Sequence, residues 1–301
     1  MNMTVSLTIA KIMKRTPILS PLARKFNAVR HRIINKKIFA LCSQAEGATA
    51  ATKEPVASNR GPIWLLWWQG EERAPEIVRA CIASIRQYRG NRRVIVLTRN
   101  NIREFVQLPD YIYSKLDAGS ITLTHFSDIV RFNLLRHYGG LWMDATLLVT
   151  KPLDTSRYFG QFFTCCGYPD PSYFSVTKGQ WTGFFIGGSS EEPLFTFMDN
   201  FFQSYWREND DLIDYFLIDY ALEYARAHRI GSLANWITEE RGKDNPRLFD
   251  LARYIARPFD PQVWDELNRY TGVYKLSWKK PRHYPKHSFG DVLLSPYLNN
   301  H

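Results

Sequence analysis

The residues best suited to chemistry lie in one short stretch, residues 127–152, which reads SDIVRFNLLRHYGGLWMDATLLVTKP. Asp128 and Arg131 are three positions apart, so on a helix they share one face. The glycine pair that follows can end that helix, and the next short apolar run, a buried strand, leads to Asp144. Open α/β sheets bind ligands beyond the carboxyl ends of their strands, so this arrangement delivers two carboxylates and an arginine to one crevice. The alternative is a surface ion pair with a capping aspartate.

Alternating strands and helices are predicted to position these residues. A strand at 62–68, a helix at 75–88 and a strand at 93–98 form a βαβ unit, which is typical of a largely parallel sheet. We predict further helices at 101–106, 109–116, 124–138, 194–206 and 211–226, further strands at 141–143, 161–166 and 181–186, and an irregular last 70 residues. The expected fold class is therefore α/β.

Four sequence blocks carry a family resemblance. SD-x-x-R, GG and L-W-M-D together resemble the core of the DXD-type sugar transferases of glycosyltransferase family 32, and most of all their capsular polysaccharide synthesis group. The further matching blocks are PIWLLWWQGEERAPEIV (62–78), DYFLIDY (214–220) and TGVYKLSW (271–278). The blocks stand in the family's order and cover roughly residues 61–280.

The resemblance implies a GT-A type fold, with a Rossmann-like nucleotide-binding sheet and a helical, irregular acceptor-side region. It implies a glycosyltransferase of the hexosyltransferase type, which moves a sugar from a nucleotide-diphospho-sugar, expected to be UDP-linked, with retention of anomeric configuration. The implied acceptor is a saccharide or a lipid-linked glycan in capsule or other surface polysaccharide synthesis. A divalent cation, Mn²⁺ or Mg²⁺, normally assists, because a hard cation on carboxylate oxygens stabilises the diphosphate leaving group.

The same resemblance assigns roles to the central residues. Asp144 would hold the metal and contact the ribose, and Asp128 would accept hydrogen bonds from donor-sugar hydroxyls. Arg131 would donate to donor-sugar or phosphate oxygens, which suit its planar fork.

One departure affects the metal. The usual D-x-D is Asp144-Ala145-Thr146 here, and threonine replaces a carboxylate poorly as a ligand. His283 and His287 are candidates for a missing ligand, although an ordinary surface or core position is the preferred interpretation of each. The departure also keeps open an alternative function, a non-catalytic sugar- or nucleotide-binding protein of the same fold.

Two later aspartates are candidates for the reaction centre. Retaining transferases often place a carboxylate or amide beside the anomeric carbon. Asp214 and Asp219 are five apart on a predicted helix and so face different directions. Asp219 is preferred as the catalytic residue, because Asp214 also suits the start of a helix, where negative charge is favourable.

Further donor-binding candidates come from the first and last blocks. Trp67, Trp68 and Gln69 follow the first strand, where related transferases stack an aromatic side chain on the nucleotide base. Adjacent strand residues point to opposite faces, so at most one of the tryptophans stacks there. Lys275 is a candidate for neutralising the diphosphate, and a surface lysine without a specific role is the alternative.

The N-terminal segment differs from the rest of the chain. Residues 1–60 carry a net charge of +9 out of +10, so the remainder is nearly neutral and does not favour a nucleic-acid partner. Residues 1–42 combine apolar stripes with basic residues, which is typical of a helix on an anionic membrane surface. The alternatives are a helix packed on the main domain and a disordered basic leader. We expect a linker at 43–60, a catalytic domain at 61–301, and a cytoplasmic protein peripheral to the inner face of the plasma membrane.

Composition limits the remaining classes. The chain has 301 residues, of which 45% are apolar and 23% charged, enough for a globular core. No apolar run is long enough to cross a membrane. The four cysteines show no C-x-x-C spacing and are predicted to be reduced thiols.

Overall fold

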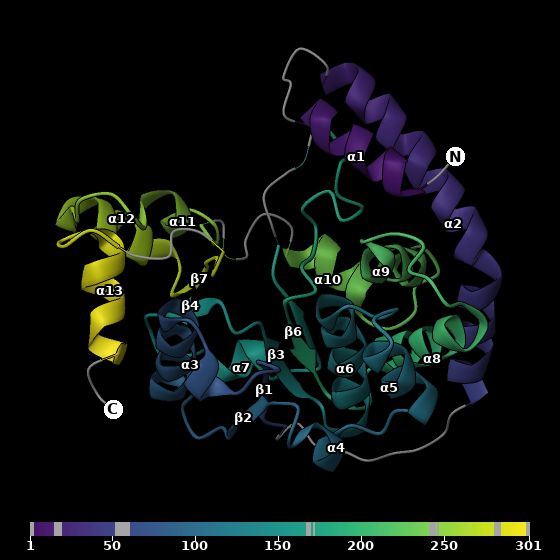
Figure 1. The fold of residues 1–301 in the computed structure, drawn as a ribbon, viewed down its shortest axis with the longest axis horizontal. Helices are drawn as coiled ribbons and strands as arrows, with labels where there is room; N and C mark the ends of the chain where they lie inside the picture. The colour runs from purple at the N-terminus through teal and green to yellow at the C-terminus, as the bar shows by residue number, and fades with distance from the viewer. Residues whose placement is uncertain are drawn as a thin grey trace.

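A five-stranded sheet forms the centre of the protein (Figure 1). The structure, a computed structural model, describes residues 3–14, 20–51, 61–166, 170, 172–240, 245, 247–279 and 284–298. In sheet order the strands are β2 (Val94–Leu97), β1 (Ile63–Leu66), β3 (Gly140–Met143), β6 (Phe185–Gly188) and β5 (Phe162–Thr164). β1 is parallel to β2 and β3, whereas β6 runs antiparallel to β3 and β5. This mostly parallel sheet confirms the predicted α/β class and is consistent with a GT-A, Rossmann-like fold.

Helices cover both faces of the sheet. Ile63 and Leu65 of β1 lie in one buried cluster with α3 (Glu76–Tyr88), whereas Trp64 lies in a second cluster with α6 (Leu123–Tyr138) and α8 (Pro193–Glu208). Alternate side chains of a strand point to opposite faces, so a strand covered on both sides needs apolar residues throughout. This is why the run at 62–68 is continuously apolar.

The glycine pair fixes where β3 begins. Gly139 ends α6 with a φ of 62°, and Gly140 follows with a φ of 98°. A Cβ on Gly140 would lie 2.2 Å from the carbonyl oxygen of Pro62. Only glycine fits this positive-φ turn and close approach, which let β3 start directly against β1.

The C-terminal region is more regular than the sequence predicted. It contains α10 (Leu233–Glu240), α11 (Leu251–Tyr254), α12 (Pro261–Tyr270) and α13 (Phe289–Leu298). β7 (Val273–Lys275) pairs antiparallel with β4 (Leu147–Val149), and α13 packs on α3. The expectation of an irregular tail was wrong because these elements are short. The start of α12 carried a signal, since the Asp260 side chain caps a helix that opens with Pro261.

Most other predicted elements lie within a few residues of their expected ends. The remaining elements are η2 (Glu71–Arg73), α4 (Ile102–Phe105), α5 (Asp110–Asp117), α7 (Thr155–Tyr158) and α9 (Leu217–Ala227). α9 starts six residues later than predicted, because Asp214 is held in a turn by a buried ion pair with Arg30. β6 likewise starts at Phe185 rather than at 181.

The N-terminal segment forms α1 (Met3–Lys14) and α2 (Ser20–Ala51), and α2 lies along α8 and α9 (Figure 1). One stripe of α2 is buried in the same core as α6 and α8: Ile34, Ile38, Cys42 and Ala45. For this stripe the packed-helix alternative is confirmed. The linker prediction was wrong for residues 43–51, which are helical, and 52–60 lie outside the described residues. No helix among the described residues has a stretch long and apolar enough to cross a bilayer.

Candidate active site

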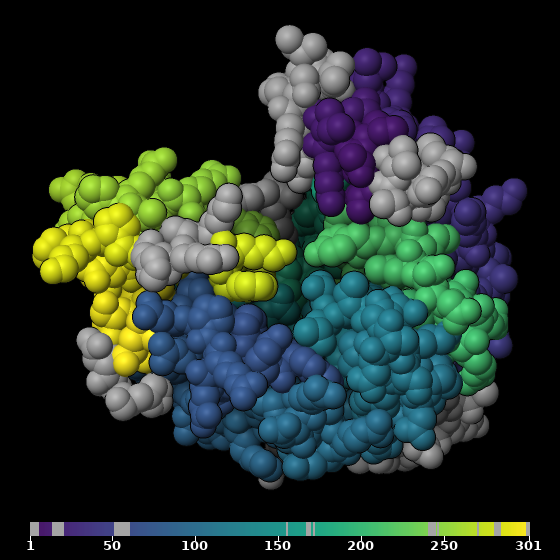
Figure 2. All heavy atoms as spheres, viewed as in Figure 1, coloured from purple at the N-terminus to yellow at the C-terminus, as the bar shows by residue number. Residues whose placement is uncertain are grey.

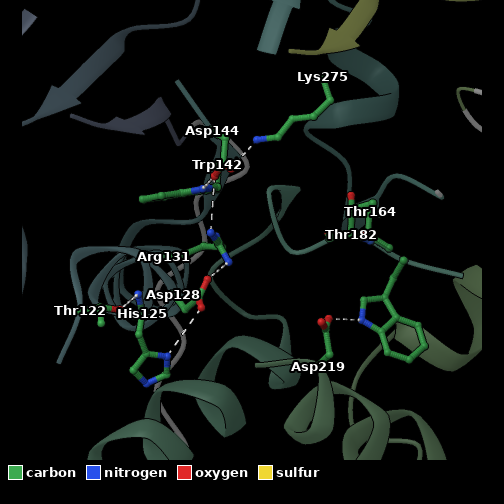
Figure 3. A network of polar contacts seen from close by, with 11 residues as sticks. Thr122, His125, Asp128, Arg131, Trp142, Asp144, Thr164, Thr182, Asp219 and Lys275 are labelled. Atoms are coloured by element: carbon green, nitrogen blue, oxygen red, sulfur yellow. Dashed lines mark hydrogen bonds and ion pairs between the residues drawn. The ribbon is translucent and has the colours of Figure 1, made fainter. Parts of the chain in front are cut away.

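Asp144 is the centre of a polar cluster at the carboxyl end of β3 (Figure 3). Its Oδ1 accepts a hydrogen bond from Trp142 Nε1 at 3.1 Å, and its Oδ2 accepts one from Lys275 Nζ at 2.6 Å. Arg131 Nη2 lies 3.6 Å from Oδ1. Burial alone would raise the pKa of Asp144, but the positive charges of Lys275 and Arg131 outweigh it and hold this pKa below its ordinary value.

α6 supplies the second carboxylate and the arginine. Arg131 Nη1 donates to Asp128 Oδ1 at 2.8 Å, which confirms that the two residues share a helix face. The Arg131 side chain is only 4% exposed and lies over the Trp142 ring. It therefore bridges Asp128 and Asp144 from within the protein. Gly183 makes room for it, since a Cβ there would lie 3.1 Å from Arg131 Nη1.

Behind Asp128 stands His125, which sequence reasoning missed. Its Nε2 accepts a hydrogen bond from Trp206 Nε1 at 2.9 Å, so in the neutral ring Nδ1 carries the proton. Nδ1 faces Asp128 Oδ2 at 3.7 Å. His125 precedes Asp128 by three residues, which is about one helical turn. This i,i+3 spacing was the only sequence signal that could have placed His125 next to Asp128.

Lys275 reaches the cluster from the other end of the chain. β7 pairs with β4 so that Lys275 lies opposite Leu147, and the Leu276 N–H donates to the Thr146 carbonyl at 2.9 Å. Lys275 Nζ also donates to Thr146 Oγ1 at 2.9 Å and lies 4.5 Å from the centre of the Phe184 ring. The alternative of a surface lysine without a role does not fit this placement.

The donor atoms around Asp144 fit a divalent cation poorly. Within the described ranges, no three or more His, Cys, Asp or Glu side chains group together as metal ligands. Asp144 is the one carboxylate of the D-A-T motif, and a lysine ammonium already occupies it. His287 is exposed in the turn before α13, where its backbone N–H donates to Asp291, and His283 lies outside the described residues. The predicted Mn²⁺ or Mg²⁺ thus remains a prediction.

Asp219 is a third carboxylate near this cluster. It lies on α9, and its Oδ1 accepts a hydrogen bond from Trp181 Nε1 at 3.1 Å (Figure 3). Burial, and after it the negative charge of Asp128, raises the pKa of Asp219 to about 7. The preference for Asp219 over Asp214 as the catalytic residue stays a prediction.

Asp214 lies elsewhere and has a structural role. It forms a fully buried ion pair with Arg30 of α2. Next to this pair, His31 Nε2 donates to the Tyr173 carbonyl at 2.7 Å, so Nδ1 accepts from the Tyr220 hydroxyl, also at 2.7 Å. Burial lowers the pKa of His31, which favours this neutral form. Helix α2 therefore holds both ends of the block 214–220, which carries Asp219, through Arg30 at Asp214 and His31 at Tyr220.

Tyr215 is the exposed residue of the block 214–220 that follows Asp214. It is 58% exposed. Burial, followed by the negative charges of Asp128, Asp144 and Asp219, raises the pKa of its hydroxyl. The space-filling view shows a hollow between the segment around β7 and the helix α9 (Figure 2). The block 214–220 was recognised in the sequence, but nothing there distinguished Tyr215 from its neighbours.

The two tryptophans after β1 separate as the strand geometry requires. Trp68 packs edge-on against Phe126 of α6, whereas Trp67 contacts Trp278, which follows β7. Trp67 Nε1 is buried and has no hydrogen-bond partner among the described residues. Gln69 is exposed in the turn that follows. Trp67 is thus the tryptophan on the Lys275 side.

The sheet and this cluster define an α/β protein with carboxylates and cations gathered at the carboxyl edge of a Rossmann-like sheet. The chain belongs to the capsular polysaccharide synthesis protein family, whose sequence model matches residues 15–292. The match includes α2, beyond the range that the four blocks covered. A shorter region is similar to the glycosyltransferase afumC of Aspergillus fumigatus, with 29% identity over 106 residues. That region is 32% of this chain and 27% of the relative, so the similarity spans about a quarter of that protein.

Proposed function

We propose that this chain is a retaining glycosyltransferase of surface polysaccharide synthesis. It would transfer a sugar from a nucleotide-diphospho-sugar, UDP-linked by expectation, to a saccharide or lipid-linked acceptor. The observation that carries the proposal is the cluster of Asp144, Lys275 and Arg131 at the carboxyl end of β3. Its family and its partial similarity to a glycosyltransferase support the same conclusion.

The chemistry required of the site is charge stabilisation at a leaving group. In the proposed reaction the bond from the anomeric carbon to the diphosphate oxygen breaks, and its electron pair stays on that oxygen. The acceptor oxygen bonds to the anomeric carbon from the same face, and its proton passes to the departing diphosphate. Lys275 and Arg131 lie where positive charge favours this diphosphate, and such preorganised charge is a large contributor to catalysis.

The carboxylates would bind and polarise the donor sugar. Asp128 is held by its hydrogen bond from Arg131 and is assigned to the sugar hydroxyls. Asp219 is assigned to the anomeric carbon, where its ionised form stabilises positive charge as the bond breaks. With a pKa of about 7, Asp219 gains this charge over the neutral pH range. Trp67, paired with Trp278, is assigned to the nucleotide base, with Gln69 beside it.

The experiment for this proposal is thermal unfolding across a panel of nucleotide sugars. A ligand that binds only the folded protein raises the unfolding midpoint by mass action. We expect one donor to raise the midpoint and to be consumed when a suitable acceptor is present. A donor that binds without turnover would instead support the binding-protein alternative. A panel in which no donor binds would contradict the proposal.

A second part of the proposal places the protein on an anionic membrane. The face of α2 opposite the core carries alternating apolar and basic residues at spacings of three and four, all exposed: Leu22, Lys25, Val29, Arg32 and Lys36. No acidic residue precedes Glu46 in the chain. Such a face suits the headgroup region of a bilayer rich in anionic lipid.

Vesicle binding tests the membrane contact. Each basic residue near an anionic surface contributes about 1 kcal/mol, so replacing three of them by glutamine should weaken binding about 100-fold. The variant is K25Q/R32Q/K36Q, and its matched control removes three exposed charges elsewhere, R79Q/R99Q/R207Q. Equal losses in both variants would show attraction by net charge alone. Binding unchanged in the α2 variant would place the contact elsewhere.

A further inference from the structure

The ammonium group of Lys275 lies between the two ends of the D-A-T motif. It donates to Asp144 Oδ2 at 2.6 Å and to Thr146 Oγ1 at 2.9 Å. These are the first and third positions of the motif, and a carboxylate usually stands at the third. Lys275 thus has a place in the site that is defined by the motif itself. Figure 3 shows its contact with Asp144.

The side chain is built into this place. Its backbone N–H donates to the Leu248 carbonyl at 2.7 Å, and the pairing of β4 with β7 fixes its register beside Thr146. The face of the Phe184 ring covers the ammonium on one side, and the side chain is 19% exposed. A lysine held at both its backbone and its charged end loses little further freedom when it binds a ligand.

The single negative charge of the D-A-T motif also matches the single positive charge of Lys275. A threonine hydroxyl is a neutral acceptor, so an ammonium between Thr146 and Asp144 is balanced by one carboxylate. Asp128 and Arg131 balance each other in the same way. A dication bound at Asp144 would find one carboxylate there and would lie against the Lys275 ammonium and the Arg131 guanidinium, of which Arg131 is already paired with Asp128, and this is an unfavourable ligand set.

An ammonium has three N–H donors, and the two contacts with Asp144 and Thr146 use two of them. The third is available to an anionic oxygen of a ligand. We propose that Lys275 takes the place of the divalent cation in this site, so that the protein binds the diphosphate of its donor without a metal. When the donor bond breaks, the electron pair remains on the diphosphate oxygen, and the Lys275 ammonium stabilises that charge. This inference rests on the proposed transferase function.

Calorimetric titration with nucleoside diphosphates tests the inference. The probes are UDP, GDP, ADP, CDP and TDP, each titrated into the full chain with EDTA and again with Mn²⁺. We expect one of them to bind with less than a twofold difference between the two conditions. Lys275→Met should weaken that binding 10- to 100-fold, because a hydrogen bond to a charged group is lost. Lys275→Arg should retain most of it, and the exposed matched control Lys279→Met should retain all of it.

A double variant should make diphosphate binding depend on Mn²⁺. T146D/K275A restores a D-x-D motif and removes the ammonium, so it should bind the same diphosphate only when Mn²⁺ is present. Unfolding midpoints of every variant show whether the fold is kept. Binding by the wild type that EDTA abolishes and Mn²⁺ restores would overturn the inference and leave the proposed transferase standing. Binding of no diphosphate in either condition would contradict the proposed function and the inference together.

Discussion

Replacing Asp219 by asparagine should stabilise the protein while abolishing transfer. The carboxylate is half-buried, and its burial, followed by the negative charge of Asp128, raises its pKa from the ordinary 3.8 to about 7. At about 1.4 kcal/mol for each pKa unit, the ionised form costs the folded state up to about 4 kcal/mol above pH 7. Asparagine removes this charge and keeps an oxygen to accept the hydrogen bond from Trp181. At about 2 °C per kcal/mol, we expect the unfolding midpoint at pH 8 to rise by about 4–8 °C.

The stability gained by Asp219→Asn should depend on pH. A carboxyl whose folded pKa is raised binds more protons in the folded state, so wild-type stability falls as pH rises from about 4 to about 7. The gain from Asp219→Asn should therefore be largest at pH 8 and shrink as pH falls. Wild-type transfer should lose activity as pH falls through about 7, because Asp219 is then protonated.

Scanning calorimetry at pH 5, 6, 7 and 8 measures the gain, and the matched control is Asp214→Asn. Asp214 pairs with Arg30 in full burial, so losing its charge should destabilise the protein by about 3–5 kcal/mol. The reasoning would be refuted by a gain from Asp219→Asn that does not vary with pH, or by a loss at every pH.

Three other substitutions test different contacts. Asp144→Asn should abolish transfer and lower the unfolding midpoint by only a few degrees, since Lys275 is partly exposed and Arg131 keeps its ion pair with Asp128; turnover at the wild-type rate would remove Asp144 from the site. Gly183→Ala should lower the transfer rate more than tenfold, because its Cβ would press on Ile218 Cδ1 and on Arg131 Nη1; unchanged kinetics would show that both side chains can move away. The double variant R30M/D214L should recover stability relative to Asp214→Asn, because no charge remains buried alone, and thermal unfolding checks this.

Sequence reasoning located the site well where the chemistry is local. Asp128, Arg131 and Asp144 lie within 17 residues, so helix periodicity and the glycine turn were enough to place them together. The separation of Trp67 from Trp68 also followed from strand geometry alone. Lys275 was named only as a candidate, because its contact with Asp144 spans 131 positions and depends on the pairing of β4 with β7.

The N-terminal region shows where such reasoning failed. Composition separates residues 43–60 from the body, since small side chains are typical of a linker, yet residues 43–51 continue α2. Small residues also suit a helix that packs closely, and Ala45 is buried against the core. Two apolar stripes were visible on α2, but only tertiary contacts decide that Ile34 and Ile38 face inward while Leu22 and Val29 face outward.

The contacts of α2 with Asp214 and Tyr220 have a consequence for synthesis and folding. Arg30 and Asp214 are 184 positions apart, and His31 and Tyr220 are 189 apart. Helix α2 is therefore synthesised long before its partners Asp214 and Tyr220, and contacts of such long sequence range are slow to form. A chain cut short before residue 214 would leave Arg30 without its partner and would lack the block that carries Asp219. The site can therefore assemble only after both α2 and the block 214–220 have been synthesised.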